Sequence, residues 1–199
     1  MPATKDEIAA TFMDLAFRFG YRRTAVEDVA RALRISKKTI YEYFPGKAAL
    51  LEYALELGAQ RQRLRVESRL TEPTALARAL QVVSIALADA RAFFESRPSA
   101  EMIEPPGLQA QVNERVYGPM VRELLEQGVA AGEFQIGDVG MTTRFVLVVG
   151  MEAVRLIRDD PTDHPEAATI QAIRRLITGE GGTAVASPAP GRKKKRKKG

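Results

Sequence analysis

The sequence predicts an all-α protein, with a small N-terminal helical domain followed by a larger C-terminal helical domain. Apolar residues recur at steps of three and four along almost the whole chain, which is the period of amphipathic helices. No segment of comparable length alternates apolar and polar residues as a half-buried strand does. Glycine and proline separate the periodic stretches. We expect domains at residues 1–48 and 49–180, and a disordered basic tail at residues 181–199.

The N-terminal domain is predicted to begin with two helices. The first places Ile8, Phe12, Leu15 and Phe19 on one face and ends at a glycine, Gly20. For the second helix, Thr24 and Glu27 have the spacing of a capping box, in which each side chain accepts a hydrogen bond from the other residue's backbone amide. This second helix is expected to bury the apolar residues Val26, Val29, Ala30 and Leu33.

A third helix follows after a short break. Ser36 is a favoured N-cap residue, and Pro45 with Gly46 ends the helix after about Tyr43. Ile40 and Phe44 lie one turn apart and are predicted to anchor its inner face on the first two helices. Its other positions carry lysines, hydroxyls, tyrosines and one carboxylate, namely Lys37, Lys38, Thr39, Tyr41, Glu42 and Tyr43.

The C-terminal domain is predicted to contain five helices. A long helix runs from Lys47 to about Leu70, and apolar periodicity continues over residues 76–94, 108–131 and 138–158. A kink is expected at Gly118-Pro119, and the run FVLVV at 145–149 fits a buried helix. Asp138 is a predicted cap, and Asp163 with Glu166 forms a second capping-box pattern before a last helix that reaches Ile177.

Composition excludes several classes of function. Cysteine is absent, so disulfides, thiol catalysis and thiolate metal sites are excluded, and the chain suits a reducing cytoplasm. The N-terminus lacks the pattern of a secretory signal, and no apolar stretch is long enough to span a bilayer. The single histidine, His164, fits a solvated loop better than a general base. We therefore expect no catalytic residues, no metal, no cofactor and no membrane contact.

Charge is distributed unevenly along the chain. Residues 1–50 carry nine Lys/Arg and six Asp/Glu, whereas residues 51–191 carry fourteen and nineteen. Residues 192–198 add seven cations and no anion. The two ends are thus basic and the middle is acidic, which indicates a polyanionic partner at the ends and a different role for the middle.

Residues 26–44 predict contact with duplex DNA. The major groove is about 12 Å wide and admits one helix, whose first turns reach the base edges. Lysines bind guanine acceptors or phosphates, and hydroxyls donate to phosphate oxygens. Lys47 would place a cation at the start of the next helix, and Thr24 could act similarly before the second. The alternative is a helical hairpin with ordinary surface lysines.

The run GYRRTAVEDVARALRISKKTIYEYFPGKAALL at residues 20–51 resembles the helix-turn-helix DNA-binding domain of TetR-family bacterial transcriptional regulators. The resemblance covers residues 5–52 closely. It implies a homodimer that binds a palindromic operator through Thr24, Ser36, Lys37, Lys38, Thr39, Tyr41, Glu42, Tyr43 and Lys47. It also implies a helical domain that dimerises and often binds a small-molecule effector, whose binding releases the operator.

Three positions depart from the usual family pattern. Arg34 stands where the turn usually has glycine, so we expect it at positive φ. Ala25 replaces a common threonine and removes one possible phosphate donor. Gly46 occupies a position that usually holds a serine or aspartate cap.

The resemblance also directs attention to apolar residues of the C-terminal domain. Candidates for an effector pocket are Phe93, Phe94, Met102, Tyr117, Met120 and Phe145, although residues of these types more often simply pack in a core. The resemblance implies that the last two helices form a four-helix dimer bundle with a second copy. Their apolar residues exceed what two monomeric helices need, and they are Phe145, Leu147, Val148, Met151, Val154, Leu156, Ala168, Ile170, Ile173, Leu176 and Ile177.

The sequence thus favours a dimeric, sequence-specific repressor that an effector relieves. A nonspecific architectural protein that binds DNA through its basic head and tail is the alternative. The tail itself allows three interpretations: a DNA arm, a patch for anionic membranes, or a solubilising extension. The lack of an adjoining apolar anchor and the basic head favour the DNA arm.

Overall fold

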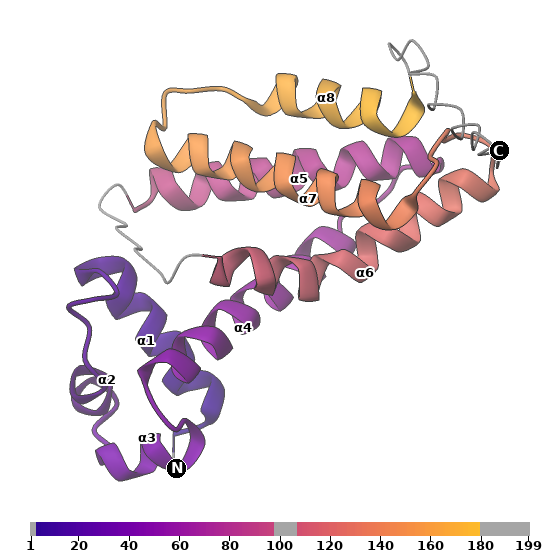
Figure 1. The fold of residues 1–199 in the computed structure, drawn as a ribbon. Coiled ribbons are helices and arrows are strands. Elements are labelled where there is room, and N and C mark those ends of the chain that lie inside the picture. Colours follow the sequence, from indigo (N-terminus) through magenta and orange to yellow (C-terminus); the bar gives the residue numbers. More distant parts are fainter. Residues whose placement is uncertain (1–2, 98–106, 180–199) are drawn as a thin grey trace, which may run out of the picture.

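The computed structural model describes residues 3–97 and 107–179, which form eight α-helices and no strand within those ranges (Figure 1). The predicted all-α class is therefore confirmed. The helices are α1 (Lys5–Phe19), α2 (Val26–Leu33), α3 (Lys37–Tyr43), α4 (Lys47–Glu67), α5 (Ala75–Glu95), α6 (Leu108–Ala130), α7 (Val139–Asp159) and α8 (Glu166–Thr178). Helices α1–α3 form a head at one end, and α5–α8 form a body to which α4 connects it.

The head forms because each of its three helices has a strongly apolar face. Ile8 and Phe12 of α1, Val29 of α2 and Ile40 of α3 are each at most 1% exposed and meet in one cluster. Gly20 ends α1 at φ 86°, a conformation that favours glycine. Residues 180–199 lie outside the described residues, so the predicted tail has no structural description.

The turn between α2 and α3 confirms the expectation for Arg34. Its φ of 55° and ψ of 41° place it in the left-handed region. Its amide N donates to the carbonyl oxygen of Arg31, and the amide N of Ile35 donates to Ala30 O at 3.0 Å. These bonds satisfy carbonyls at the end of α2, so the backbone geometry of a glycine cap is kept without a glycine.

The predicted capping box of α2 is wrong by one residue. The N-cap is Ala25, whose amide donates to Asp28 Oδ2 at 2.9 Å. The Thr24 hydroxyl instead donates back to Gly20 O at 3.0 Å. Both pairs have the same spacing, so the sequence pattern alone could not tell which residue would begin the helix.

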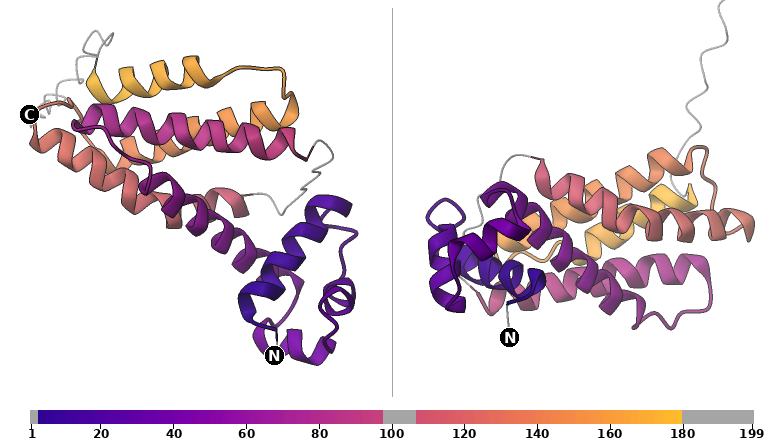
Figure 2. Two further views of the ribbon diagram at one scale, coloured as in Figure 1. Left: turned by 180° about the vertical axis from the view of Figure 1, so that it is seen from behind. Right: turned by 90° about the horizontal axis from the view of Figure 1, so that it is seen from below.

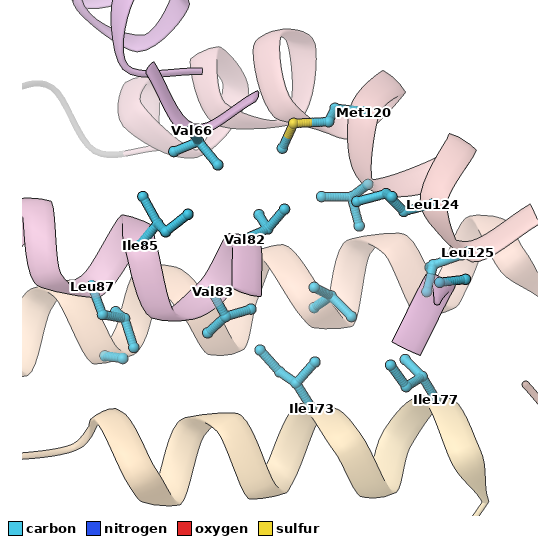
Figure 3. Packing of buried hydrophobic residues seen from close by; sticks show 14 of the residues in the cluster. Val66, Val82, Val83, Ile85, Leu87, Met120, Leu124, Leu125, Ile173 and Ile177 are labelled. Carbon is cyan, nitrogen blue, oxygen red and sulfur yellow. The ribbon is translucent and has the colours of Figure 1, made fainter. Parts of the chain in front are cut away.

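The body is held by a second apolar cluster. Residues from α5, α6, α7 and α8 converge there, and Val66 near the end of α4 joins them (Figure 3). Ile173 and Ile177 of α8 are at most 1% exposed and point toward Val83 and Leu125. Two residues proposed for a dimer bundle are thus core residues of a single chain.

Helix α6 belongs to both clusters. Val112 and Val116, in its first half, are buried in the head cluster with α1 and α4. Beyond Pro119, Leu124 and Leu125 are buried in the body cluster. Tyr117, which lies between them, packs against both clusters. Because α4 also contributes to both clusters, the two cores are connected through two helices, α4 and α6, rather than separated by a linker.

The last two helices begin at different kinds of cap. The predicted Asp138 cap of α7 is confirmed, because Asp138 Oδ1 accepts from Met141 N at 2.9 Å. The predicted Asp163–Glu166 capping box of α8 is wrong, and Pro165 is the N-cap. The Glu166 carboxylate instead accepts a hydrogen bond from Nε of Arg91 in α5 at 2.5 Å. An ion pair between α5 and α8 therefore uses the carboxylate that the predicted capping box would have needed.

The end of α8 lies at the opposite end of the molecule from the head, as all views agree (Figures 1 and 2). There the amide of Gln135, in the α6–α7 connection, donates to Ile177 O at 3.2 Å. Within the described ranges, none of the helices combines the length and apolarity that crossing a membrane requires.

Candidate nucleic-acid interface

The outward face of α3 is polar and exposed. Lys37, Lys38 and Glu42 are exposed, and the rings of Tyr41 and Tyr43 are 50% and 42% exposed despite their size. The opposite face is fixed, because Ile40 and the C-cap residue Phe44 are buried in the head core. This anchoring presents the two tyrosines and the lysines to solvent in a defined direction.

The start of α3 is stabilised by its own side chains. Ser36 is the N-cap, as predicted, and its Oγ accepts from Thr39 N at 3.1 Å. The hydroxyls of Ser36 and Thr39 also lie 3.0 Å apart. Both residues therefore orient the helix, and the Ser36 side chain remains exposed beside the lysines.

Lys37 is paired with Glu27, which the sequence had indicated only as a helix-capping residue. Its Nζ donates to Glu27 Oε1 of α2 at 2.9 Å, and both side chains are about half exposed. This hydrogen bond raises the pKa of Lys37 and lowers the pKa of Glu27. Ten residues separate the pair, so no local spacing rule could have found it. Lys37 is charged and held in place, but its charge is partly neutralised.

Lys47 is also held by the head. Its Nζ donates to Arg22 O at 3.3 Å and lies 4.3 Å from the ring centroid of Tyr21. Partial burial lowers its pKa. A Lys ammonium has three donors, so two remain for another acceptor. Lys47 thus joins the end of the α1–α2 connection to the start of α4, close to α3.

Thr24 does not fit the predicted phosphate contact. It is only 2% exposed, and its hydroxyl is committed to Gly20 O. The residue stabilises the α1–α2 connection from inside. Nearby cations on the surface are Arg22, Arg23 and Arg34, all exposed.

Tyr117 and Met120, two of the residues predicted to line an effector pocket, pack against other side chains of the body cluster. Met120 is buried in the body cluster. The Tyr117 hydroxyl donates to Gln62 Oε1 of α4 at 3.0 Å, and burial raises its pKa strongly. Close by on α5, Asp89 accepts from Arg69 at 2.7 Å through Oδ1, while its Oδ2 is buried without a partner among the described residues.

Phe93 and Phe94 lie at the end of α5, where body and head meet. The Phe93 ring contacts Phe17 of α1, with centroids 4.9 Å apart, and Phe94 at 5.2 Å. Phe94 also packs against the body cluster. The two rings therefore form a direct apolar contact between α1 and the body. Met102, the remaining candidate of this region, lies outside the described residues.

Phe145, predicted to line an effector pocket, is exposed in the single chain. Its side chain lies on the outer face of α7 and is 50% exposed, as are Met141 at 46% and Val148 at 55%. Spacings of four and three residues place the three side chains on one stripe. The run at 145–149 is therefore not buried as predicted, because only Val146 among its residues is buried.

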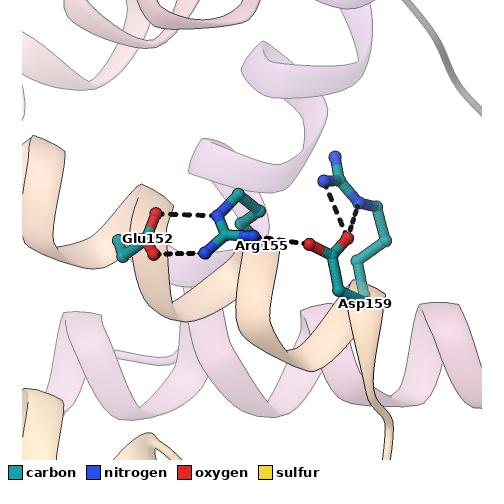
Figure 4. A network of polar contacts seen from close by, with 4 residues as sticks. Glu152, Arg155 and Asp159 are labelled. Carbon is teal, nitrogen blue, oxygen red and sulfur yellow. Dashed lines mark hydrogen bonds and ion pairs between the residues drawn. The ribbon is translucent and has the colours of Figure 1, made fainter.

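The same stripe of α7 continues into charged residues. Glu152 accepts from Arg155 through both carboxylate oxygens, at 2.6 and 2.9 Å (Figure 4). Arg155 also donates to Asp159 at 2.6 Å.

Small residues on the exposed face of α8, Ala168 and Ala172, would allow close approach of another helix. Within the described residues, no group of three acidic or histidine side chains could hold a metal ion.

Comparison with known proteins agrees with this arrangement. Residues 8–54 match the family described as bacterial regulatory proteins, tetR family. A search of curated proteins found no match. Solved structures with this fold include FadR from Bacillus halodurans, with a TM-score of 0.69 and 20% identity over 89% of this chain and 96% of that one.

Two further structures share the fold at similar identity. A tetR family transcription regulator from Shewanella sp. PV-4 has a TM-score of 0.66 and 22% identity over 88% of this chain and 98% of that one. FadR from Bacillus subtilis, in complex with stearoyl-CoA, has a TM-score of 0.66 and 19% identity over 87% and 97%. The chain thus combines a tetR-type N-terminal domain with the overall fold of TetR-family regulators.

Proposed function

We propose that this chain, with its tetR-type domain and TetR-like fold, is a transcriptional regulator that binds an operator as a homodimer. The observation that carries the proposal is the outward face of α3. Tyr41 and Tyr43 are 50% and 42% exposed there, beside Lys37 and Lys38, and the Tyr43 ring also lies 6.5 Å from the ring of Phe44. A helix that served only to complete the head core would need Ile40 and Phe44 but not these side chains. The combination suits a helix that enters the major groove.

The proposal assigns different tasks to the residues of this surface. Tyr41, Lys38 and Tyr43 would contact bases or phosphates directly. Ser36 and Thr39 would position α3, and Lys47 would contact the phosphate backbone next to Arg22. Thr24 has no place among these contacts, because it is buried.

A homodimer would use the outer faces of α7 and α8. The apolar stripe Met141, Phe145 and Val148 is exposed in the single chain, which favours burial against a second copy. A palindromic operator requires two heads related by a two-fold axis, so dimerisation and site recognition belong together.

A small-molecule effector is proposed for the body, where it would relieve repression. Tyr117 packs against both the body and the head clusters, Phe93 contacts Phe17 of α1, and Phe94 and Met120 pack in the body. A molecule that displaced these side chains would disturb the position of α1 and α4. Stearoyl-CoA, which one structural neighbour binds, is a reasonable first probe. Its binding would raise the thermal midpoint of the protein and weaken operator binding.

Selection of bound sequences from random duplex DNA tests the function. We expect a palindromic consensus, and footprinting should protect that site alone. Tyr41→Ala should weaken binding to the selected duplex at least about tenfold, since one lost base contact costs about 1–3 kcal/mol. Leu64→Ala, at an exposed apolar residue of α4, is the matched control and should bind normally.

The alternative, a nonspecific architectural protein, predicts another outcome. Selection would then yield no consensus, and footprinting would protect no preferred site. Tyr41→Ala would weaken binding to all duplexes equally. Either result would overturn the proposed site-specific regulator.

A further inference from the structure

The end of α5 contacts two parts of the molecule that a dimer on DNA must hold in a fixed relation. One is the connection between α7 and α8, the helices proposed for the dimer interface. The other is α1, which belongs to the head. In Figure 1 the end of α5 and the α7–α8 connection lie at the same end of the body. Both contacts come from residues 91–94, which we call the α5 junction.

On the body side of the α5 junction, Arg91 uses all three nitrogens of its guanidinium. Its Nε donates to the Glu166 carboxylate at 2.5 Å, and its terminal nitrogens donate to Pro161 O at 2.7 Å and Asp163 O at 2.6 Å. The side chain is only 15% exposed. Because the guanidinium is a planar fork, three such bonds fix direction as well as distance. The start of α8 and the connection before it are therefore held to α5.

On the head side of the α5 junction, the Phe93 ring contacts the ring of Phe17 in α1, with centroids 4.9 Å apart and planes at 66°. The Phe94 ring lies 5.2 Å from the Phe93 ring and packs against the body cluster. These rings connect α1 directly to the body core. Because Phe12 of α1 is 0% exposed in the head core, a movement of Phe17 also moves the head.

Helix α1 is attached to the rest of the molecule near both of its ends. Near its start, Asp6 accepts from the Tyr53 hydroxyl at 2.7 Å and pairs with Arg61 at 3.4 Å, and both partners belong to α4. Phe17 lies about 16 Å farther along α1, at about 1.5 Å per residue. The two attachments therefore act on well-separated points of one rigid helix, and they lead to different helices.

The contact between Phe17 and Phe93 adds a third helix to those that hold the head. The head core also receives side chains from α4 and from the neighbouring α6, such as Val112. Two adjacent helices permit the head to rock about their common direction, whereas a contact on α5 at the far end of α1 opposes that motion. The α5 junction thus ties the angle of the head to the start of α8.

We propose that Arg91 and Phe93 are positioning residues that set the distance between the two heads of the dimer, and hence the half-site spacing that it accepts. The proposal rests on the function proposed above. One base pair changes the separation of two half-sites by about 3.4 Å and their relative rotation by about 35°. A head held at a fixed angle tolerates neither change, whereas a head that rocks tolerates both.

Operators with altered spacing test this role. The selected palindrome is used as found, and with one base pair added to or removed from its centre. The wild-type dimer should bind the altered duplexes on the order of 100-fold more weakly, because avidity is lost when both heads cannot bind together. Phe17→Ala, Phe93→Ala and Arg91→Lys should each lose at most about tenfold, since their heads can adjust. Lysine keeps the charge of Arg91 but cannot reproduce its fork.

Binding to a duplex with a single half-site separates positioning from general damage to the head. Its affinity should be the same in all variants, because the α3 surface is unchanged. A variant that bound the half-site more weakly but kept the wild-type response to spacing would have a structural role only, which would overturn the proposal. So would a wild-type response in every respect. A monomeric variant by ultracentrifugation would assign its residue to dimer stability instead and overturn its positioning role.

Phe19→Ala is the matched control. Phe19 is the same residue type in the same helix, two residues beyond Phe17, but its side chain is 49% exposed and its ring lies beside Arg18. This variant should respond to spacing as the wild type does. An equal gain of tolerance in Phe19→Ala would show that the effect does not come from the contact with α5, and would overturn the proposal.

Cross-linking provides the reverse test. The chain contains no cysteine, so Phe17→Cys with Phe93→Cys introduces its only two thiols. The reduced double variant should tolerate altered spacing, and joining its thiols with a short bismaleimide should restore the preference for one spacing. Unchanged tolerance after cross-linking would overturn the proposal. Absence of any palindromic consensus for the wild-type chain would instead contradict the proposed function, so the two failures are distinguishable.

Discussion

At the scale of single residues, Arg34 stands out because it is the one non-glycine residue with a positive φ among the described residues. A residue with a Cβ loses roughly 1–2 kcal/mol in the left-handed region, whereas glycine does not. The side chain is exposed and has no ion pair among the described residues that would offset this cost. The exposed guanidinium adds a cation to the surface beside α3, where a phosphate oxygen would be its natural partner.

Replacing Arg34 therefore separates strain from charge. Arg34→Gly should leave the free energy of unfolding unchanged or raise it by up to about 1 kcal/mol, because relief of strain exceeds the added chain entropy. Arg34→Ala keeps the strain and should be about 1 kcal/mol less stable than Arg34→Gly. Urea unfolding measures both, and equal stabilities of the two variants would contradict the strain. Both variants should weaken DNA binding equally, since both remove the cation.

Glu27 offers a second test at this scale. Because it accepts from Lys37, Glu27→Gln removes the only negative charge in that pair and should strengthen binding to any duplex several-fold at low salt. Lys37→Gln should weaken binding. The expected gain is larger at 50 mM than at 200 mM salt, as titration of a labelled duplex would show. Unchanged affinity in Glu27→Gln would mean that the pair lies away from the DNA.

At the scale of elements, helical periodicity predicted all eight helices, and most bounds agree within three residues. The errors are at caps, where several residues compete for one role. Thr24 and Asp163 have the spacing of capping residues. However, the Thr24 hydroxyl is buried and donates to Gly20 O. Glu166, the predicted partner of Asp163, accepts from Arg91 of α5 instead. Likewise, the α3 face could be predicted from residue type, whereas the Glu27–Lys37 pair could not, because it depends on how α2 packs on α3.

The stripe on α7 yields a prediction about assembly. A double variant, Phe145→Glu with Val148→Glu, should place two charges in the proposed dimer interface and yield a monomer. Both side chains are about half exposed in the single chain, so helical content should be unchanged. Analytical ultracentrifugation gives the mass and circular dichroism the helicity. Leu64→Glu, at a 57% exposed apolar position of α4, should leave the dimer intact. A dimeric double variant would exclude this stripe from the interface.

At the scale of the whole molecule, the two hydrophobic clusters are not independent. Val112 and Val116 of α6 complete the head core, although they lie about 60 residues beyond the matched N-terminal domain. The ring contact between Phe17 and Phe93 adds a second connection. A boundary drawn at residue 48 follows the DNA-binding sequence pattern, but packing continues across it through α4 and α6. This continuity would transmit a change in the body to the spacing of the two heads.

Shared packing predicts one cooperative unfolding transition. Val112→Ala should lower the free energy of unfolding by about 2 kcal/mol, because it removes buried methyl groups from the head core. Since α6 joins both cores, helicity of the body and DNA binding by the head should be lost at the same lowered temperature. Val129→Ala, an exposed valine on the same helix, should cost at most about 0.5 kcal/mol. Two separate transitions in Val112→Ala, with only the head destabilised, would show that α6 does not couple the cores, and the proposed transmission from effector to operator would then need another path.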